Sequence, residues 1–234
     1  DDIQFIGSGP TVGDNSTFEQ ALKILSDYNI ETPKKVINNA SAQSGVILPT
    51  DMRLSKTENI IFAAPSQSLE AASKIAIDEY GFEVINLGDE LQGEAREVAR
   101  KQAEQAMQIQ QKLTAVQPPV LLLSGGELTV TAKGNGIGGP NAEFCLALAI
   151  ALKEQEGIFG FAADTDGVDG KAEVAGAFIT PTTLKDAEKS NISPEKSLEE
   201  NDSHRFFGKI NSQVITGPTL TNVNDFRAIL IYSI

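Results

Sequence analysis

The chain has 234 residues, a net charge of −13 at pH 7 and 41% hydrophobic residues. This length fits one large domain or two small ones, and the apolar content is enough for a sizeable core. The negative charge argues against a nucleic-acid-binding protein, which needs a basic face, and against attraction to an anionic membrane surface.

The cysteine content of the chain indicates the redox environment of the protein. Cys145 is the single cysteine, so no disulfide can form within the chain, and we expect a reducing, cytoplasmic environment. Cys145 lies in an apolar run, and we interpret it as a core thiol. No stretch reaches the roughly 20 apolar residues that a membrane-spanning helix needs, so we expect no membrane partner.

The first half of the chain alternates apolar runs with helical periodicity. We predict, in chain order, a strand at 3–7, a helix at 17–28, a helix start at Thr32 and Pro33, a loop over 41–57, a strand at 60–64, a helix at 66–80 ending at Gly81, a strand at 82–87 and a long helix at 93–115. The first strand has no initiator methionine before it, so we expect the chain to begin inside a larger protein.

The two prolines at 118 and 119 suggest a boundary, giving domains at 1–117 and 118–234. We then predict strands at 120–123 and 128–132, and we expect the second strand to be half-exposed and antiparallel to the first. After them we predict an amphipathic helix at 141–153, a strand at 158–163, helices near 180–189 and 195–208, and final strands at 214–215 and 228–232. The alternation predicts an α/β fold with a layered mixed sheet flanked by helices.

Four turns combine glycine with hydroxyl or carboxylate groups, and such turns after strands are typical ligand sites. They are residues 8–11, 124–127 after a buried strand, 134–143 opening a helix, and 164–170 after another strand. Paired glycines let backbone N–H groups approach an anion.

Residues 134–139 formally satisfy G-x-G-x-x-G, but the preceding strand alternates and the next acid lies too far along for a dinucleotide site. We interpret this turn as a helix N-terminus built for an anion. Three aspartates within residues 164–169 need a cation or donors nearby, and Mg²⁺ held with substrate phosphate fits better than calcium. His204, the single histidine, is expected to be structural.

Together these segments resemble the glycerate 2-kinase family, long also known as hydroxypyruvate reductase. The matching segments include residues 8–11 with Asp14, 93–96, 124–127, 134–143, 165–170, 175–177 and 216–225, in the family's order. The resemblance implies a glycerate-kinase-like, leucine-rich C-terminal domain (the multi-organism-fragment domain) plus the end of a Rossmann-like first domain. The family's active site lies in the cleft between its two domains.

The resemblance also implies ATP- and Mg²⁺-dependent phosphorylation of D-glycerate to 2-phosphoglycerate, so the expected partners are glycerate and a nucleotide; a homodimer is left open. We assign catalysis to Asp166, Glu127 and Asp169, with Asp166 and Asp169 also holding metal. The expected substrate- and phosphate-binding residues are Ser8, Thr11, Ser124, Gly125, Gly126, Gly136, Gly138, Gly139, Asn141, Glu143, Thr216, Thr219 and Asn222. Two alternatives stay open: an NAD(P)H-dependent hydroxypyruvate reductase, and a non-catalytic fragment or subunit of the kinase.

Overall fold

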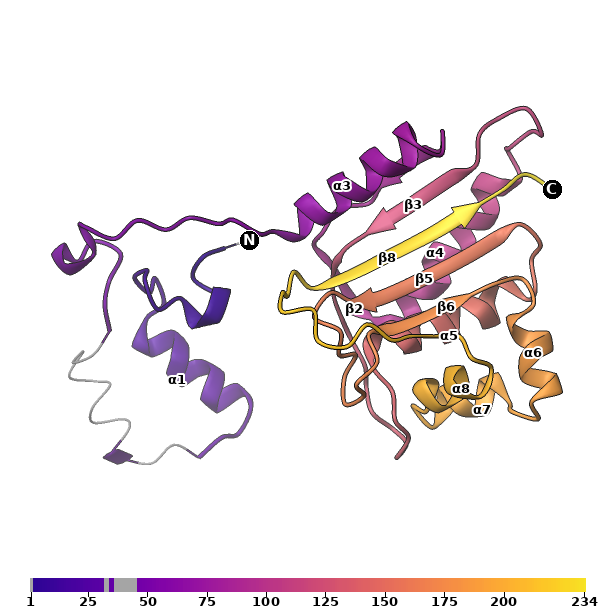
Figure 1. Cartoon of the computed structure of the whole chain (residues 1–234). Helices are drawn as coiled ribbons and strands as arrows, with labels where there is room; N and C mark the ends of the chain where they lie inside the picture. Colours follow the sequence, from indigo (N-terminus) through magenta and orange to yellow (C-terminus); the bar gives the residue numbers. More distant parts are fainter. Residues whose placement is uncertain (1, 32–33, 36–45) are drawn as a thin grey trace. The chain divides into compact units, whose positions relative to one another are not determined.

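A computed structural model describes residues 2–31, 34–35 and 46–234, and these divide into two compact units, Asp1–Phe62 and Ala63–Ile234 (Figure 1). Each unit is described by itself. The helix start expected at Thr32 and Pro33, and part of the loop expected at 41–57, lie outside the described residues.

The first unit contains a short 3-10 helix at Ile6–Ser8, helix α1 at Phe18–Asp27 and a second 3-10 helix at Met52–Leu54. The predicted helix at 17–28 is confirmed. Thr17 caps it through a capping box: its side chain accepts a hydrogen bond from the Gln20 N–H, and the Gln20 side chain accepts one from the Thr17 N–H.

Two predicted strands are wrong. Residues 3–7 form turns and the 3-10 helix, because Gly7 and Gly9 take left-handed backbone angles that bend the chain. Residues 60–64 form no strand either, and Ile60 and Phe62 are exposed. A strand requires a neighbour to pair with its backbone groups, and no described residue pairs with this segment.

The second unit is built on a mixed sheet, as predicted, and this sheet has six strands (Figure 1). Its strands in spatial order are β1 (Glu83–Asn86), β3 (Val120–Ser124), β8 (Asp225–Ile231), β5 (Ile158–Asp164), β6 (Gly176–Ile179) and β7 (Gln213–Val214). β1 and β3 are parallel, and the remaining pairs are antiparallel.

A separate two-stranded sheet joins β2 (Leu91–Glu94) in parallel to β4 (Gly126–Thr129). The strand predicted at 128–132 was expected to pair with 120–123, and this expectation is wrong. Gly126 has a φ of 95°, a left-handed turn that takes the chain away from β3, and the place beside β3 is filled by β8 instead.

Six helices belong to this unit, and their bounds are α3 at Pro65–Asp78, α4 at Ala95–Gln110, α5 at Pro140–Leu152, α6 at Thr183–Lys189, α7 at Pro194–Glu199 and α8 at Ser203–Lys209. In Figure 1, α4 and α5 run behind the sheet. α4 starts later than predicted because residues 91–94 belong to β2, and it ends at Gln110 rather than at 115. None of the helices in the described ranges is long and apolar enough to cross a membrane.

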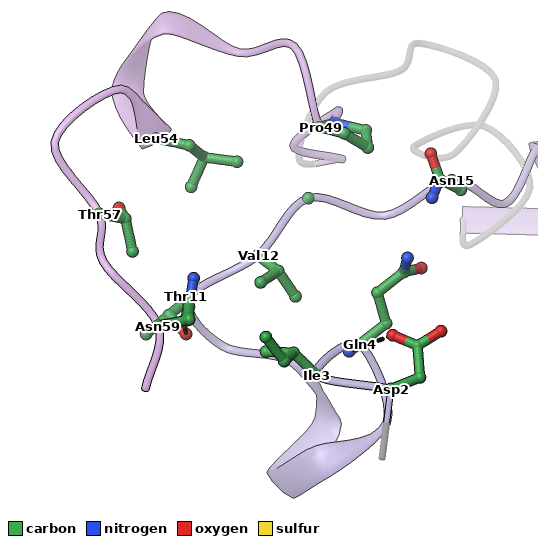
Figure 2. Close-up of a pocket in the computed structure, with 11 residues that line it drawn as sticks. Asp2, Ile3, Gln4, Thr11, Val12, Asn15, Pro49, Leu54, Thr57 and Asn59 are labelled. Carbon is green, nitrogen blue, oxygen red and sulfur yellow. Dashed lines mark hydrogen bonds between the residues drawn. The ribbon is translucent and has the colours of Figure 1, made fainter. Parts of the chain in front are cut away.

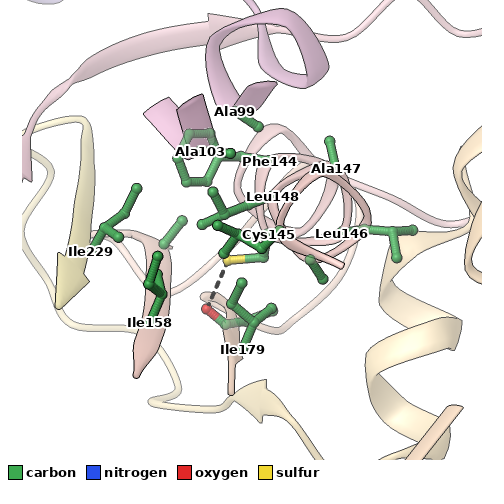
Figure 3. Packing of buried hydrophobic residues seen from close by; sticks show 14 of the residues in the cluster. Ala99, Ala103, Phe144, Cys145, Leu146, Ala147, Leu148, Ile158, Ile179 and Ile229 are labelled. Atoms are coloured by element: carbon green, nitrogen blue, oxygen red, sulfur yellow. Dashed lines mark hydrogen bonds between the residues drawn. The ribbon is translucent and has the colours of Figure 1, made fainter. Parts of the chain in front are cut away.

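Helix α5 is the centre of the hydrophobic core. It was predicted to be amphipathic, but it is buried on nearly all sides, because α4, β5, β6, α7 and α8 all contact it. Cys145 lies within this core, as predicted, and its thiol donates to the Ala177 carbonyl at 3.2 Å (Figure 3). Burial raises the pKa of the Cys145 thiol, which keeps it protonated.

The boundary expected after residue 117 stays a prediction. Strands from both sides of it, β1 and β3, pair directly with each other inside the second unit.

Candidate active site

The polar residues of the second unit converge at one edge of the sheet. β5 ends at Asp164, and β8, running the opposite way, begins at Asp225, which is the register partner of Asp164. β3 ends nearby at Ser124, which faces Arg227 on β8. Loops at the carboxyl ends of strands in α/β sheets are the usual place for ligands.

The turn after β5 carries two adjacent carboxylates. The Asp166 N–H donates to Asp164 Oδ1 at 2.9 Å, and the Val168 N–H donates to Asp166 Oδ1 at 2.8 Å. Burial, together with the neighbouring carboxylates of Asp166 and Asp225, raises the pKa of Asp164 to about 6. A cation bound at this turn would relieve that repulsion.

The structure brings residues 216–222, part of the segment 216–225 singled out from the sequence, against this turn. The Asn222 side-chain amide donates to Asp166 Oδ2 at 3.2 Å, and the Thr219 N–H donates to the Asp166 carbonyl at 3.1 Å. Thr216 is exposed on the same loop. Gly167, at a φ of 95°, meets the Gly217 carbonyl where a Cβ would sit, so this close approach requires glycine.

Asp169 is committed to the start of helix α5. Its Oδ1 accepts from the Asn141 N–H at 3.0 Å and from Asn141 Nδ2 at 3.2 Å. Its Oδ2 accepts from the Ala142 N–H at 2.8 Å and lies 3.0 Å from His204 Nε2. The positive end of α5, where we expected a substrate anion, therefore already holds the protein's own carboxylate.

Behind Asp169 lies a buried ion pair that sequence reasoning left out of the site. Arg227 Nη1 donates to Asp225 Oδ2 at 2.9 Å, and Asn141 Nδ2 donates to Asp225 Oδ1 at 2.6 Å. Burial raises the pKa of Asp225 and lowers that of Arg227. Both shifts measure the cost of removing these charges from water.

The glycine-rich turn at 134–139 packs against residues 200–203. The Gly136 N–H donates to the Glu200 carbonyl at 2.9 Å, and Asn201 Oδ1 accepts from the backbone N–H of Lys133 and Gly134. A Cβ on Gly138 would lie 2.8 Å from the Asn201 carbonyl oxygen. Several amides expected to face a ligand thus bind the protein itself.

Glu143 is fully buried and also faces inward. It forms an ion pair with Arg96 at 2.7 Å, and it accepts from Asn201 Nδ2 at 2.9 Å. Gly139 meets Asp169 where a Cβ would sit. These two residues therefore contribute to the framework around the turn.

The turn after β3 is held in a similar way. The Ser124 hydroxyl is buried and accepts from Gln102 Nε2 at 3.2 Å, and the Gly125 N–H donates to the Gly88 carbonyl at 2.8 Å. Gly126 meets the Leu91 backbone where a Cβ would sit. Glu127 alone in this turn presents an exposed side chain.

Ser8 and Thr11 belong to the first unit. The Thr11 hydroxyl donates to Asn59 Oδ1 beside a hollow of about 470 Å³ (Figure 2). The hollow is lined by Asp2, Ile3, Gln4, Thr11, Val12, Gly13, Asn15, Pro49, Leu54, Thr57 and Asn59, all within this unit. It contains none of the carboxylates at the end of β5.

The donor set fits Mg²⁺ only in part. Among the described residues, no three His, Cys, Asp or Glu side chains gather as a metal site. Asp164 and Asp166 offer two neighbouring carboxylates, and Mg²⁺ is commonly held by one or two carboxylates together with substrate phosphates and water. Asp164 was visible in the sequence as the first of three clustered aspartates, but nothing there separated its role from that of Asp169.

Asp164→Asn is expected to stabilise the protein at pH 7.5 by about 1 kcal/mol. The folded pKa of Asp164, about 6, lies above its ordinary value of 3.8, so the charged form opposes folding. The stabilising contribution of the protonated carboxyl is complete below about pH 4 and is lost as the pH rises through 6. Urea unfolding at pH 7.5 and 4 should show a benefit from the substitution only at the higher pH; an equal effect at both would contradict the assignment.

Comparison with known proteins identifies the chain's relatives. Residues 120–225 match the MOFRL family, and residues 1–41 match a domain of unknown function, DUF4147. A protein of Agrobacterium vitis named putative hydroxypyruvate reductase is 43% identical over 99% of this chain and 52% of its own length. The D-glycerate 2-kinase of Thermotoga maritima is 37% identical over 96% of this chain and 52% of its own length.

A crystal structure of the Thermotoga maritima glycerate kinase aligns with a TM-score of 0.84, covering 99% of this chain and 54% of that one. The chain therefore spans about half the length of the curated relatives it matches. The sheet edge described above falls within the matched segment, since residues 124–169 and Asp225 all lie inside it. Residues 120–225 match the MOFRL family, and the chain is similar along nearly its whole length to proteins named glycerate 2-kinase and putative hydroxypyruvate reductase.

Proposed function

We propose that the chain carries part of the active site of a kinase that transfers the γ-phosphoryl group of ATP to D-glycerate, giving 2-phosphoglycerate and ADP. The observation that carries this proposal is the likeness to the Thermotoga maritima D-glycerate 2-kinase along nearly the whole chain, in sequence and in fold. The paired carboxylates Asp164 and Asp166 at the end of β5 support it, because phosphoryl transfer depends on positioned charge rather than on a covalent intermediate.

In this proposal Asp166 is the principal ligand for Mg²⁺, and Asp164 stands beside it. Mg²⁺, when bound, would neutralise charge on the transferring phosphoryl group. Asn222 and Thr219 orient Asp166 through its side chain and its carbonyl, so the loop at 216–222 sets where the carboxylate points. Asp169 is buried with both oxygens engaged by α5 and His204, whereas Asp166 is partly exposed, so we remove Asp169 from the proposed metal site and give it a supporting role.

Phosphate contacts are proposed for groups that face outward at this edge. Thr216 and Glu127 are both exposed there. We assign the phosphate contact to the Thr216 hydroxyl, and Glu127 is the carboxylate that orients the substrate hydroxyl. The oxygen of that hydroxyl forms a bond to the γ-phosphorus as the bond to the bridging oxygen of ADP breaks, and the hydroxyl proton is released. Ser8 and Thr11 stay predicted contacts of the first unit.

Hydroxypyruvate reduction is the second candidate, favoured by the name of the Agrobacterium vitis relative. It requires a dinucleotide site, and the G-x-G-x-x-G turn gives it little support because this turn packs on residues 200–203. A non-catalytic subunit is the third candidate, since the chain spans about half of its relatives.

One set of assays separates the three candidates. The longest natural reading frame containing these residues should release ADP from ATP and Mg²⁺ only when D-glycerate is present, and ³¹P NMR should identify 2-phosphoglycerate. Oxidation of NADH by hydroxypyruvate without phosphoryl transfer would favour the reductase. The absence of both activities from that protein would leave the non-catalytic role.

A further inference from the structure

We propose that the buried Asp225–Arg227 pair is the positioning device of this site, fixing residues 125–128, which lead from β3 into β4, against the start of helix α5. The effect of the pair on kcat rests on the proposed phosphoryl transfer, whereas its positioning role rests on the hydrogen bonds that Asp225 and Arg227 form. Neither residue is assigned a contact with substrate, so both would act through the groups that they hold.

The pair holds the turn after β3 at both ends. Arg227 donates from Nη2 to the Gly125 carbonyl, and Asp225 Oδ2 accepts from the Leu128 N–H at 3.4 Å. Glu127, the exposed carboxylate of the turn, lies between these two anchors. β8 therefore anchors the backbone on both sides of Glu127.

The same pair holds the start of α5. Asp225 Oδ1 accepts from Asn141 Nδ2 at 2.6 Å, and Asn141 also donates to Asp169. Asp169 lies in the same loop as Asp166, directly after Asp164 at the end of β5. Asp225 thus connects the two turns that bear the proposed catalytic carboxylates, which are otherwise far apart in the sequence.

Burial of the pair gives these contacts their weight. Arg227 is 1% exposed and Asp225 is 5% exposed. An apolar pair often fills such a place with equal or better stability, so a buried ion pair is weak evidence for a purely stabilising role. Arg227 Nε also has no hydrogen-bond partner among the described residues, so the pair is not optimised as a bridge. Its distinguishing feature is that it connects three separate segments.

The test uses Arg227→Met, Arg227→Lys and the apolar double variant Asp225→Leu/Arg227→Met in the longest natural reading frame. We expect Arg227→Met to lower kcat for D-glycerate phosphorylation about 100-fold with KM changed less than about threefold, because misplaced groups lose transition-state contacts rather than ground-state binding. Arg227→Lys keeps the charge and should recover part of kcat. The double variant should fold and stay slow; recovery of kcat in it would overturn the proposal.

Gln110→Leu is the matched control. Gln110 is buried at the opposite end of the same sheet, where Nε2 donates to the carbonyls of Glu156 at 2.8 Å and Tyr232 at 2.9 Å. Its loss removes hydrogen bonds to the residues just before β5 and just after β8, without touching the site. We expect kcat to stay within about twofold of the unsubstituted protein.

Hydrogen exchange tests the positioning without relying on activity. Arg227→Met should speed exchange of the amides at 126–128 and 141–142, and Gln110→Leu should not. Equal exchange in the two variants would overturn the positioning role. If the unsubstituted protein does not phosphorylate glycerate, the proposed function fails, while the exchange result still decides the role of the pair.

Discussion

Asp169→Ala is expected to lower the free energy of unfolding of the second unit by about 3–5 kcal/mol. The carboxylate accepts hydrogen bonds from the Asn141 and Ala142 N–H groups at the start of α5 and lies against His204. Helix starts leave such N–H groups without partners inside the helix, and the capping residue here, Gly139, has no side chain to satisfy them. Alanine would leave several buried donors unpaired at once.

Urea unfolding at pH 7, followed by circular dichroism, measures this cost, and Asp186→Ala is its control. Asp186 also lies near a helix start and faces Lys189 at 2.9 Å, but its side chain is 42% exposed, so its removal should cost less than about 1 kcal/mol. Asp169→Asn, which keeps the shape and turns an N–H toward Ala142, should fall between the two. Equal losses for Asp169→Ala and Asp186→Ala would contradict the capping role.

Asp166→Asn is expected to lower turnover of D-glycerate about 100-fold or more, by the loss of a charge placed for the transferring phosphoryl group. The substitution should preserve the fold, because an asparagine oxygen can still accept from the Val168 N–H as Asp166 does at 2.8 Å. Steady-state kinetics at several Mg²⁺ concentrations measure the effect. The half-saturating concentration of Mg²⁺ should rise in the variant.

Asp186→Asn serves as the control for charge, since it removes one surface carboxylate away from the sheet edge. It should leave both turnover and the Mg²⁺ requirement unchanged. Turnover in Asp166→Asn equal to that in the unsubstituted protein would remove Asp166 from the proposed metal site.

Local patterns were sufficient for the helices and for the buried strands. α1 and α3 follow from apolar spacing and from the signals at their ends, and β3 and β5 follow from continuous apolar runs. The predictions failed for strands whose formation or pairing depends on a neighbouring segment. Residues 60–64 have a strand-like composition but no neighbour among the described residues, and β4 pairs with β2 rather than with β3.

The candidate site shows the same division. The sequence pointed to the aspartates at 164–169 and to the loop at 216–222, and the structure brings Asp166, Thr219 and Asn222 together. The sequence does not indicate that Asp169 turns inward to cap α5, because residue 169 follows this helix in the chain and capping residues normally precede the helix that they cap. Asp225 closes the segment 216–225 that the sequence singled out, and Arg227 lies just before the strand predicted at 228–232, so neither was assigned to the site.

By itself, the sequence determined the α/β class, the position of helix α5 in the chain and the order of glycine and carboxylate turns, because these depend on local periodicity and turn chemistry. Only the tertiary structure decided which donors and carboxylates face one another. Asp164, Asp169 and Asp225 differ little in sequence, yet one is half-buried beside Asp166, one caps a helix and one is paired with Arg227. Burial and the neighbouring charges set those differences, and both arise from segments that meet only when the sheet has formed.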